Sequence, residues 1–224
     1  MQQRPLSMRL GAEFIGTFAL VLVGCGAIVV DAHTGGLVTH PGVALAFGGV
    51  VTLMIYALGD VSGAHINPAV SLGFWLSGRL SAREALGYLL SQCAGALAAS
   101  AALRAAFPLH QTLGATLPGI APLWAWWVEL AITFVLVFVI FEVVRAGPTR
   151  ARVGGFAIGA TVGIAAFSAG PFTGASMNPA RSLGPALVSG SFSHLWIYCT
   201  APFLGAALAL FGCRFLRGPE CCRG

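Results

Sequence analysis

Charged side chains are scarce in this chain of 224 residues, and lysine is absent altogether. Charged residues make up 8% of the sequence, whereas soluble domains contain about 25%. So few polar groups could not cover the surface of a soluble fold. An intrinsically disordered chain is excluded, because disorder requires low hydrophobicity. A collagen-like chain is also excluded, because the 30 glycines show no triplet period. We therefore expect much of the surface to lie in a lipid bilayer.

The basic residues are all arginine, and they give the chain a formal net charge of +5. They are scattered singly between apolar runs, without a basic stripe interleaved with aromatics, so nucleic-acid binding is not expected. The 6 cysteines have neither the spacing of a metal site nor the pattern of a disulfide framework. Most are read as small hydrophobic residues, with palmitoylation as an alternative for Cys221 and Cys222. No metal and no cofactor is expected.

Six apolar runs are long enough to cross a membrane, which takes about 20 residues of α-helix. They are approximately residues 10–30, 42–59, 85–106, 123–144, 153–169 and 195–215. The first run could be taken for a signal peptide, but it contains Glu13 and further apolar runs follow it. The fold class expected from these runs is an all-α, multi-pass integral membrane protein.

The arginines indicate the orientation of the chain if the runs alternate in direction. All of them except Arg104 and Arg181 then fall on the face that carries both termini. Because positive charge accumulates on the cytoplasmic side, both termini are expected to be cytoplasmic, in a plasma or inner membrane. Trp124 and Trp196 begin runs on the opposite face, where they suit an interfacial aromatic belt.

An internal repeat divides the chain into two halves. Ser62-Gly-Ala-His-Ile-Asn-Pro-Ala recurs as Thr173-Gly-Ala-Ser-Met-Asn-Pro-Ala, and the pattern Glu-x-x-x-Thr-Phe begins at both Glu13 and Glu129. Each half holds an odd number of spans, so the second half starts on the opposite side of the membrane and the repeat is inverted. The expected repeat units are 9–112 and 118–217, within a single transmembrane channel domain that covers 1–224.

Each half also contains a short helical segment that begins at Asn-Pro-Ala, at Asn67-Pro68-Ala69 and at Asn178-Pro179-Ala180. Asparagine is a preferred N-cap and proline is favoured at the first helical position, so each motif reads as the start of a helix. Its length of about eleven residues, at 1.5 Å per residue, crosses only half of a bilayer. Irregular backbone at this depth must be buried in protein or line a water-filled cavity, which predicts a pore.

Inverted symmetry brings the two half-helices together, N-terminus to N-terminus, near the bilayer midplane. Each N-terminus carries roughly half a positive charge. We expect these ends to repel cations, while the side-chain amides of Asn67 and Asn178 point into the channel and donate hydrogen bonds to a neutral solute. A water molecule held by both amides could not relay a proton.

The paired motifs, with Arg181 directly after the second, resemble those of the aquaporin and aquaglyceroporin family over nearly the whole chain. The resemblance implies six tilted helices with two re-entrant half-helices, a pore in each protomer, and a homotetramer. It also implies an outer constriction at Arg181, with Phe47, Ala166 and Ala175 as its other members. Independently, a buried cation close to a helix N-terminus is unfavourable, which marks Arg181 as functional.

The residues around the constriction favour different solutes. Ala166 stands where strict water channels have histidine. The smaller side chain widens the opening for glycerol or urea. A shift of the alignment by one residue would place Phe167 at this position instead and narrow the opening. Ser182 stands where glycerol facilitators usually have aspartate, which favours a strict water channel as the alternative. The run from Gly174 to Asn178 resembles nodulin-type plant members and their bacterial relatives, a subgroup associated with water, glycerol and small metalloid acids.

Three other polar residues are expected near the pore. His65 is expected either to line the vestibule or to pack in the core. Glu13 and Glu129 are expected to accept hydrogen bonds from the loops behind the half-helices, because a buried carboxylate needs donors.

Two rival functions remain. An ion-coupled transporter also has inverted repeats, but it needs ionisable groups at the midplane, and only Arg181 and the two glutamates appear there. An intramembrane enzyme would need a catalytic motif, and the sequence has none. A passive channel for water and small uncharged solutes, and not an enzyme, is therefore expected.

Overall fold

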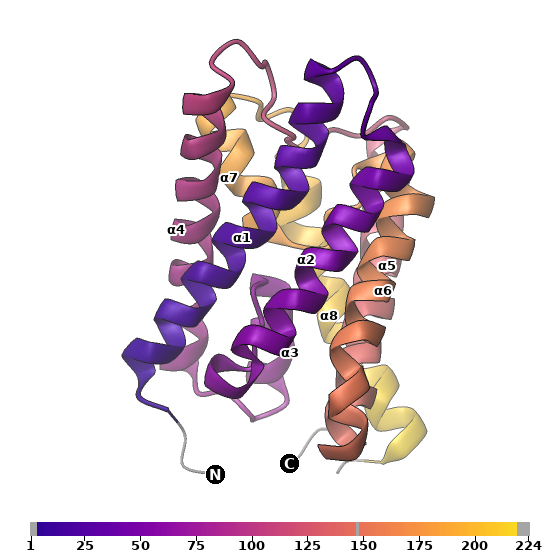
Figure 1. The fold of residues 1–224 in the computed structure, drawn as a ribbon. Coiled ribbons are helices and arrows are strands. Elements are labelled where there is room, and N and C mark those ends of the chain that lie inside the picture. Colours follow the sequence, from indigo (N-terminus) through magenta and orange to yellow (C-terminus); the bar gives the residue numbers. More distant parts are fainter. Residues whose placement is uncertain (1–3, 147, 219–224) are drawn as a thin grey trace.

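A computed structural model describes residues 4–146 and 148–218. Cys221, Cys222 and Arg223 lie outside the described residues. Within these ranges every regular element is a helix, and Figure 1 shows them as one bundle. The long helices are α1 (Leu6–His33), α2 (Thr39–Ser62), α4 (Ala82–Ala106), α5 (Pro122–Arg145), α6 (Pro148–Thr173) and α8 (Leu195–Arg217). The short helices are α3 (Pro68–Leu76) and α7 (Pro179–Ser189).

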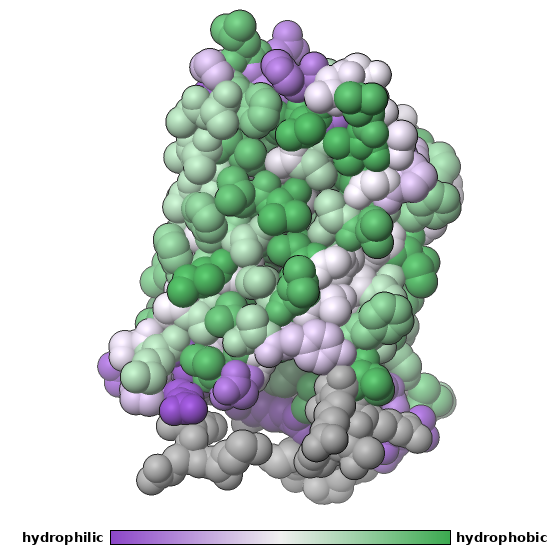
Figure 2. Space-filling model, in the orientation of Figure 1, coloured by the Kyte–Doolittle hydropathy of each residue, from purple (hydrophilic) through white to green (hydrophobic). Residues whose placement is uncertain are grey.

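The long helices confirm the expected membrane spans. Among the described residues, 6 helices are long and apolar enough to cross a bilayer, and each contains one of the apolar runs. On the face that Figure 2 shows, hydrophobic residues cover the middle of the molecule and hydrophilic residues gather toward its two ends. This distribution is expected for a protein whose middle part lies in the hydrocarbon core of a bilayer.

The two halves of the chain are arranged as the inverted repeat predicts. The start of α1 and the end of α8 lie on one face of the bundle, which we call the terminal face; α3 lies toward this face and α7 toward the opposite one (Figure 1). Helix α1 packs on α2 and α4, just as α5 packs on α6 and α8. The halves interlock because α3 contacts α8 and α7 contacts α4, so each half-helix is held partly by the other half.

Glycines let the helices approach closely at equivalent crossings in the two halves. A Cβ on Gly95 in α4 would collide with the carbonyl oxygen of Phe14 in α1, and one on Gly205 in α8 would lie 2.5 Å from that of Leu130 in α5. A Cβ on Gly184 in α7 would lie 2.7 Å from the carbonyl oxygen of Ala96. Small residues at such contacts are the usual means of packing helices in lipid, where burial supplies no hydrophobic drive between them.

A contact between α2 and α6 compensates for a proline near the end of α6. Pro171 has no N–H, so the carbonyl group of Phe167 lacks its helical donor. The Nε2 atom of His40, at the start of α2, lies 2.7 Å from this carbonyl oxygen, and the rings of His40 and Phe167 stack at 5.4 Å. Because a carbonyl oxygen can only accept, Nε2 carries the hydrogen.

Replacing His40 by phenylalanine is expected to lower the thermal stability of the protein. The ring can still stack on Phe167, but the hydrogen bond is lost at a cost of about 1 kcal/mol, or about 2–4 °C in Tm for a chain of this size. Thermal unfolding in detergent measures the change, and His40→Gln, which keeps an N–H donor, serves as the control. Equal melting temperatures for the wild type and His40→Phe would contradict the assignment.

Candidate functional site

The half-helices begin with the same capping chemistry. The Oδ1 atom of Asn67 accepts a hydrogen bond from the backbone N–H of Ala69 at 2.9 Å. Asn178 Oδ1 accepts from Ala180 N at 3.0 Å and from Arg181 N at 3.2 Å. In both helices a proline follows the cap at the first helical position, as expected. These two are the only asparagines in the sequence.

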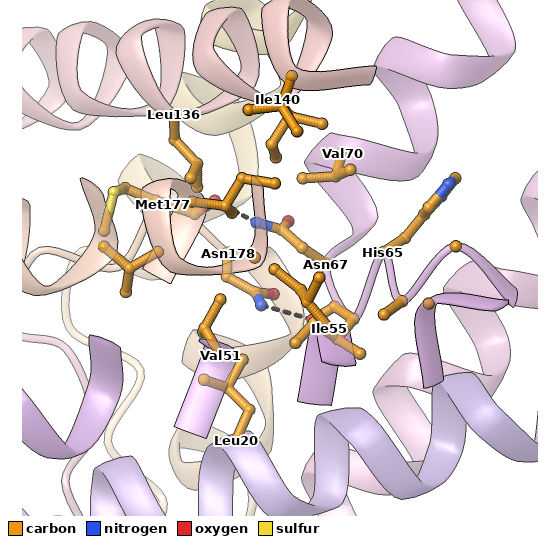
Figure 3. A pocket seen from close by; sticks show the side chains of 18 of the residues that line it. Leu20, Val51, Ile55, His65, Asn67, Val70, Leu136, Ile140, Met177 and Asn178 are labelled. Carbon is orange, nitrogen blue, oxygen red and sulfur yellow. Dashed lines mark hydrogen bonds between the residues drawn. The ribbon is translucent and has the colours of Figure 1, made fainter. Parts of the chain in front are cut away.

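The two asparagines also join the half-helices to each other. Asn67 Nδ2 donates to the carbonyl oxygen of Met177 at 2.8 Å, and Asn178 Nδ2 donates to that of Ile66 at 2.8 Å (Figure 3). The helix N-termini therefore meet near the centre of the bundle. Each amide nitrogen has two hydrogens and spends one on the opposite loop, which leaves the second for a molecule in the cavity that both asparagines line.

The loop ahead of each half-helix has an unusual backbone conformation that is repeated in both halves. In each loop three residues have positive φ: a glycine, the alanine after it, and the residue before asparagine. The values are 87°, 47° and 44° at Gly63, Ala64 and Ile66, and 82°, 41° and 53° at Gly174, Ala175 and Met177. A non-glycine residue in this region costs about 1–3 kcal/mol, so surrounding contacts must hold these loops.

Glu13 and Glu129 provide those contacts. Both side chains are fully buried. Glu13 accepts hydrogen bonds from the backbone N–H groups of His65 and Ile66 at 2.9 and 2.6 Å, and from the side chains of Ser62 and Gln92. Glu129 accepts from the N–H groups of Ser176 and Met177, both at 2.9 Å, and from the hydroxyl of Thr173. Each carboxylate thus lies behind its loop and fixes the strained residues.

Two buried tyrosines complete this support, and the sequence analysis did not assign them. Tyr88 donates to the carbonyl oxygen of Ser62 at 2.7 Å, and Tyr198 donates to that of Thr173 at 2.6 Å. Ser62 and Thr173 are the first residues of the repeated segment, and each tyrosine lies on the last long helix of its half. A tyrosine at a similar place in both halves was the signal that could have indicated their role.

A cavity of about 800 Å³ runs past the paired asparagines. At one end it reaches Phe47 and Arg181, and toward the terminal face it reaches Asp60 and Val144 at the ends of α2 and α5. Figure 3 shows that aliphatic side chains surround the asparagines, with these labelled: Leu20, Val51, Val70, Leu136 and Ile140. A solute here meets an apolar wall broken by a few hydrogen-bonding groups.

Arg181, a member of the expected constriction, is held in place by its contacts. Its side chain is buried, with 2% of the residue exposed, and Nη1 donates to the carbonyl oxygen of Gly114 at 2.8 Å. The guanidinium carbon lies 5.0 Å from the centroid of the Phe47 ring, within range of a cation–π interaction. Nε has no hydrogen-bond partner. The structure therefore brings together Phe47, Ala175 and Arg181, and all three line the cavity.

Ala166 is buried on α6 but does not line this cavity. Val162 does, and its spacing of four residues puts Ala166 on the same helix face, one turn farther from the terminal face. Its place in the constriction stays a prediction. Phe167, the alternative, is 55% exposed and stacks on His40, so its ring does not narrow the pore.

His65 is both buried and in contact with the cavity. Its ring packs against Phe74 and Tyr88, with centroids 4.4 and 5.1 Å away, and Nδ1 lies 3.1 Å from the hydroxyl oxygen of Ser71. The same residue lines the cavity on the terminal side of Asn67. The two expectations for His65, packing and vestibule, therefore describe one position.

The loop between α4 and α5 folds back into the bundle, and this was not foreseen. Arg104 Nη1 donates to the carbonyl oxygens of Pro108 and His110 at 3.0 and 2.8 Å. His110 Nδ1 in turn accepts from the N–H of Leu113 at 3.0 Å. These contacts lead the chain to Gly114, which binds Arg181. Arg104, which the distribution of charge left unexplained, thus shapes the loop.

Within the described part of the chain no cluster of three metal-ligating side chains occurs.

Comparisons with known proteins agree with this geometry. Residues 1–212 match the family model described as Major intrinsic protein. The chain is 47% identical to Aquaporin NIP1-4 of Oryza sativa subsp. japonica, over 92% of this chain and 76% of that protein. It is 42% identical to Aquaporin NIP1-1 of Zea mays, over 95% and 76%. The X-ray structure of the aquaglyceroporin from Plasmodium falciparum superposes with a TM-score of 0.83 at 24% identity, covering 92% of this chain and 95% of that one.

Proposed function

The chain belongs to the major intrinsic protein family, and on this basis we propose that it is a passive channel for water and small uncharged solutes such as glycerol, urea and metalloid acids. The observation that carries the proposal is the pair of reciprocal hydrogen bonds between Asn67 and Asn178 and the opposite loops, beside a continuous cavity. Two positive helix ends and two amide donors beside this cavity support the passage of a neutral solute.

Exclusion of ions and protons follows from the same arrangement. A cation entering the cavity meets both helix N-termini and then the guanidinium of Arg181. A neutral molecule has no charge to be repelled, and its oxygen can accept hydrogen bonds from the amide groups of Asn67 and Asn178. A water molecule that accepts from both amides directs its own hydrogens away from the neighbouring waters along the pore, so a proton cannot be passed through it.

The wider solute range is supported by the placement of the constriction residues. Ala166 adds only a methyl group, Phe167 points away, and the described part of the cavity wall near Arg181 carries no histidine. Ser182, the residue that favoured a strict water channel, is fully buried and does not line the cavity, so it offers no direct argument about pore width.

An ion-coupled transporter is not supported by the surroundings of the glutamates. Glu13 and Glu129 each hold a loop through at least three hydrogen bonds, and neither lines the cavity. A coupling carboxylate must bind and release a cation during transport, which these contacts would prevent.

We further propose cytoplasmic termini in a plasma or inner membrane, repeat units at 9–112 and 118–217, and a homotetramer.

Proteoliposomes test the proposed function by stopped-flow light scattering. Vesicles that contain the protein should shrink much faster than empty vesicles when challenged with an impermeant osmolyte. When glycerol is the osmolyte, they should shrink and then re-swell as it enters. Shrinkage no faster than in empty vesicles would refute the channel, whereas fast shrinkage without accelerated re-swelling would leave a strict water channel. A requirement for a proton or sodium gradient would favour the transporter instead.

A further inference from the structure

A chain of buried hydroxyl groups fastens the loop between α4 and α5 to the second half-helix. Thr116 Oγ1 donates to Ser182 Oγ at 2.8 Å. The hydroxyl oxygens of Ser182 and Ser176 lie 2.5 Å apart, and Ser176 Oγ donates to the carbonyl oxygen of Asn178 at 2.9 Å. All three hydroxyl-bearing residues are buried. The chain of hydrogen bonds therefore links the loop to the asparagine that caps α7.

The direction of these hydrogen bonds is fixed by counting hydrogens. A hydroxyl group has one hydrogen to donate. Ser176 gives its hydrogen to Asn178, so it must accept from Ser182. Ser182 therefore accepts from Thr116 and donates to Ser176. Every hydrogen in the chain is used once, and removal of the Ser182 hydroxyl would take away the acceptor of the Thr116 hydrogen.

The same loop holds Arg181 two residues before Thr116. The carbonyl oxygen of Gly114 accepts from Arg181, and Ser182 is the next residue of α7. Two loop residues, Gly114 and Thr116, thus bind two consecutive residues of the helix. The methyl group of Thr116 also lies against Gly174, where an added Cβ would be 3.0 Å away. The loop cannot shift along α7 without breaking both contacts.

The first half has an equivalent serine but no equivalent loop. Ser71 occupies the same position after Asn67 as Ser182 does after Asn178. Its hydroxyl oxygen accepts from Gln92 Nε2 at 3.0 Å and faces His65, so its partners come from α4 and the re-entrant segment. Only in the second half does the serine bind the loop between α4 and α5, and only there does an arginine follow the motif.

We propose that Thr116 and Ser182 are positioning residues for solute selection. They hold the loop on α7, the loop presents the Gly114 carbonyl to Arg181, and this contact keeps the guanidinium at the side of the pore, against the Phe47 ring. The inference rests on the proposed channel function, and it assigns Ser182 an effect on solute choice through the arginine, although Ser182 does not touch the cavity.

The test compares the ratio of glycerol to water permeability in proteoliposomes. This ratio does not depend on how much folded protein is present, so a merely destabilised channel keeps it. Thr116→Val preserves the shape of the side chain and removes its hydroxyl donor, and Ser182→Ala breaks the chain at its middle. Thr116→Ser restores the donor. Ser100→Ala is the matched control, because Ser100 is also buried but binds only the Ala96 carbonyl within its own helix.

Thr116→Val and Ser182→Ala are each expected to lower the ratio by about fivefold, the change in population that loss of one neutral hydrogen bond produces. The released arginine obstructs glycerol more than water. The double variant should resemble the single ones, because both break one chain. Thr116→Ser and Ser100→Ala should keep the wild-type ratio.

Unchanged ratios in both Thr116→Val and Ser182→Ala, or equal losses in Ser100→Ala, would overturn the proposal. If one variant is not recovered in folded form, the other decides. A wild-type protein that conducts neither solute would instead refute the channel function itself.

Discussion

Asn67→Asp is expected to turn the channel into one that leaks cations. The two helix N-termini contribute roughly half a positive charge each, so a single carboxylate at their junction cancels the barrier. The substitution also replaces the amide donor that binds Met177 with an acceptor, which opens the contact between the half-helices. The cap on α3 survives, since aspartate accepts from the N–H of Ala69 as well as asparagine does.

Ion flux into proteoliposomes measures the effect, with an entrapped dye that reports sodium or protons. Asn67→Ser separates charge from hydrogen bonding, because serine also caps a helix but adds no charge; it should change water permeability without a cation leak. Asn178→Asp should leak less than Asn67→Asp, since Arg181 follows within the same turn. A leak in Asn67→Ser equal to that in Asn67→Asp would show that charge at the helix ends is not what excludes cations.

The spans and the half-helices could be predicted because their signals are local in sequence. A run of about 20 apolar residues is typical of a membrane helix, and asparagine followed by proline favours the start of a helix, all the more when the motif recurs with matching flanks. The inverted arrangement needed only the repeat and an odd number of spans. The contacts of Glu13 and Glu129 could also be anticipated, since a buried carboxylate must find donors and strained loops offer free N–H groups.

The contacts of the loop between α4 and α5 could not be predicted. The loop sequence has no periodic pattern. Its main contact with Arg181 uses the backbone carbonyl of Gly114, and a backbone group cannot be recognised from the type of residue that carries it. Arg104 was an unexplained exception to the distribution of arginines. Its partners are backbone carbonyl groups as well, so the sequence contains no acidic residue that would indicate them. Similarly, the orientation of Phe167 depended on the phase of α6 and on His40, a residue more than a hundred positions earlier. Such contacts appear only when the fold brings distant segments together.

The two halves share the same supporting residues but differ in the contacts that these residues make. Both have a capping asparagine, a buried glutamate, a tyrosine and a serine at the fourth helical position after the cap. In the first half these groups connect only to the bundle. In the second half they also connect to the α4–α5 loop and to Arg181. We therefore expect the two helix ends to contribute equally to the proposed cation barrier, whereas the contribution of Arg181 and the proposed discrimination among neutral solutes belong to the second half.

Glu13→Leu is expected to prevent the protein from folding stably. The substitution leaves the N–H groups of His65 and Ile66 and the side chains of Ser62 and Gln92 without an acceptor. A buried donor without a partner costs about 1–3 kcal/mol, so the four together approach the whole stability of a typical protein, about 5–15 kcal/mol. The positive-φ residues of the loop would also lose the contacts that hold them. Size-exclusion chromatography in detergent should show aggregates instead of a single monodisperse species.

The same substitution at two other glutamates makes a graded series. Glu129→Leu removes the acceptor for three donors, so it should be slightly less damaging than Glu13→Leu. Glu142→Leu is the control, because the ion pairs of this residue with Arg145 and Arg217 are partly exposed and contribute about 0–1 kcal/mol. It should yield a monodisperse protein with nearly wild-type water permeability. If Glu13→Leu and Glu142→Leu were recovered equally well, the re-entrant loops would be held by packing alone, because their hydrogen bonds to the buried carboxylate would then contribute no measurable stability.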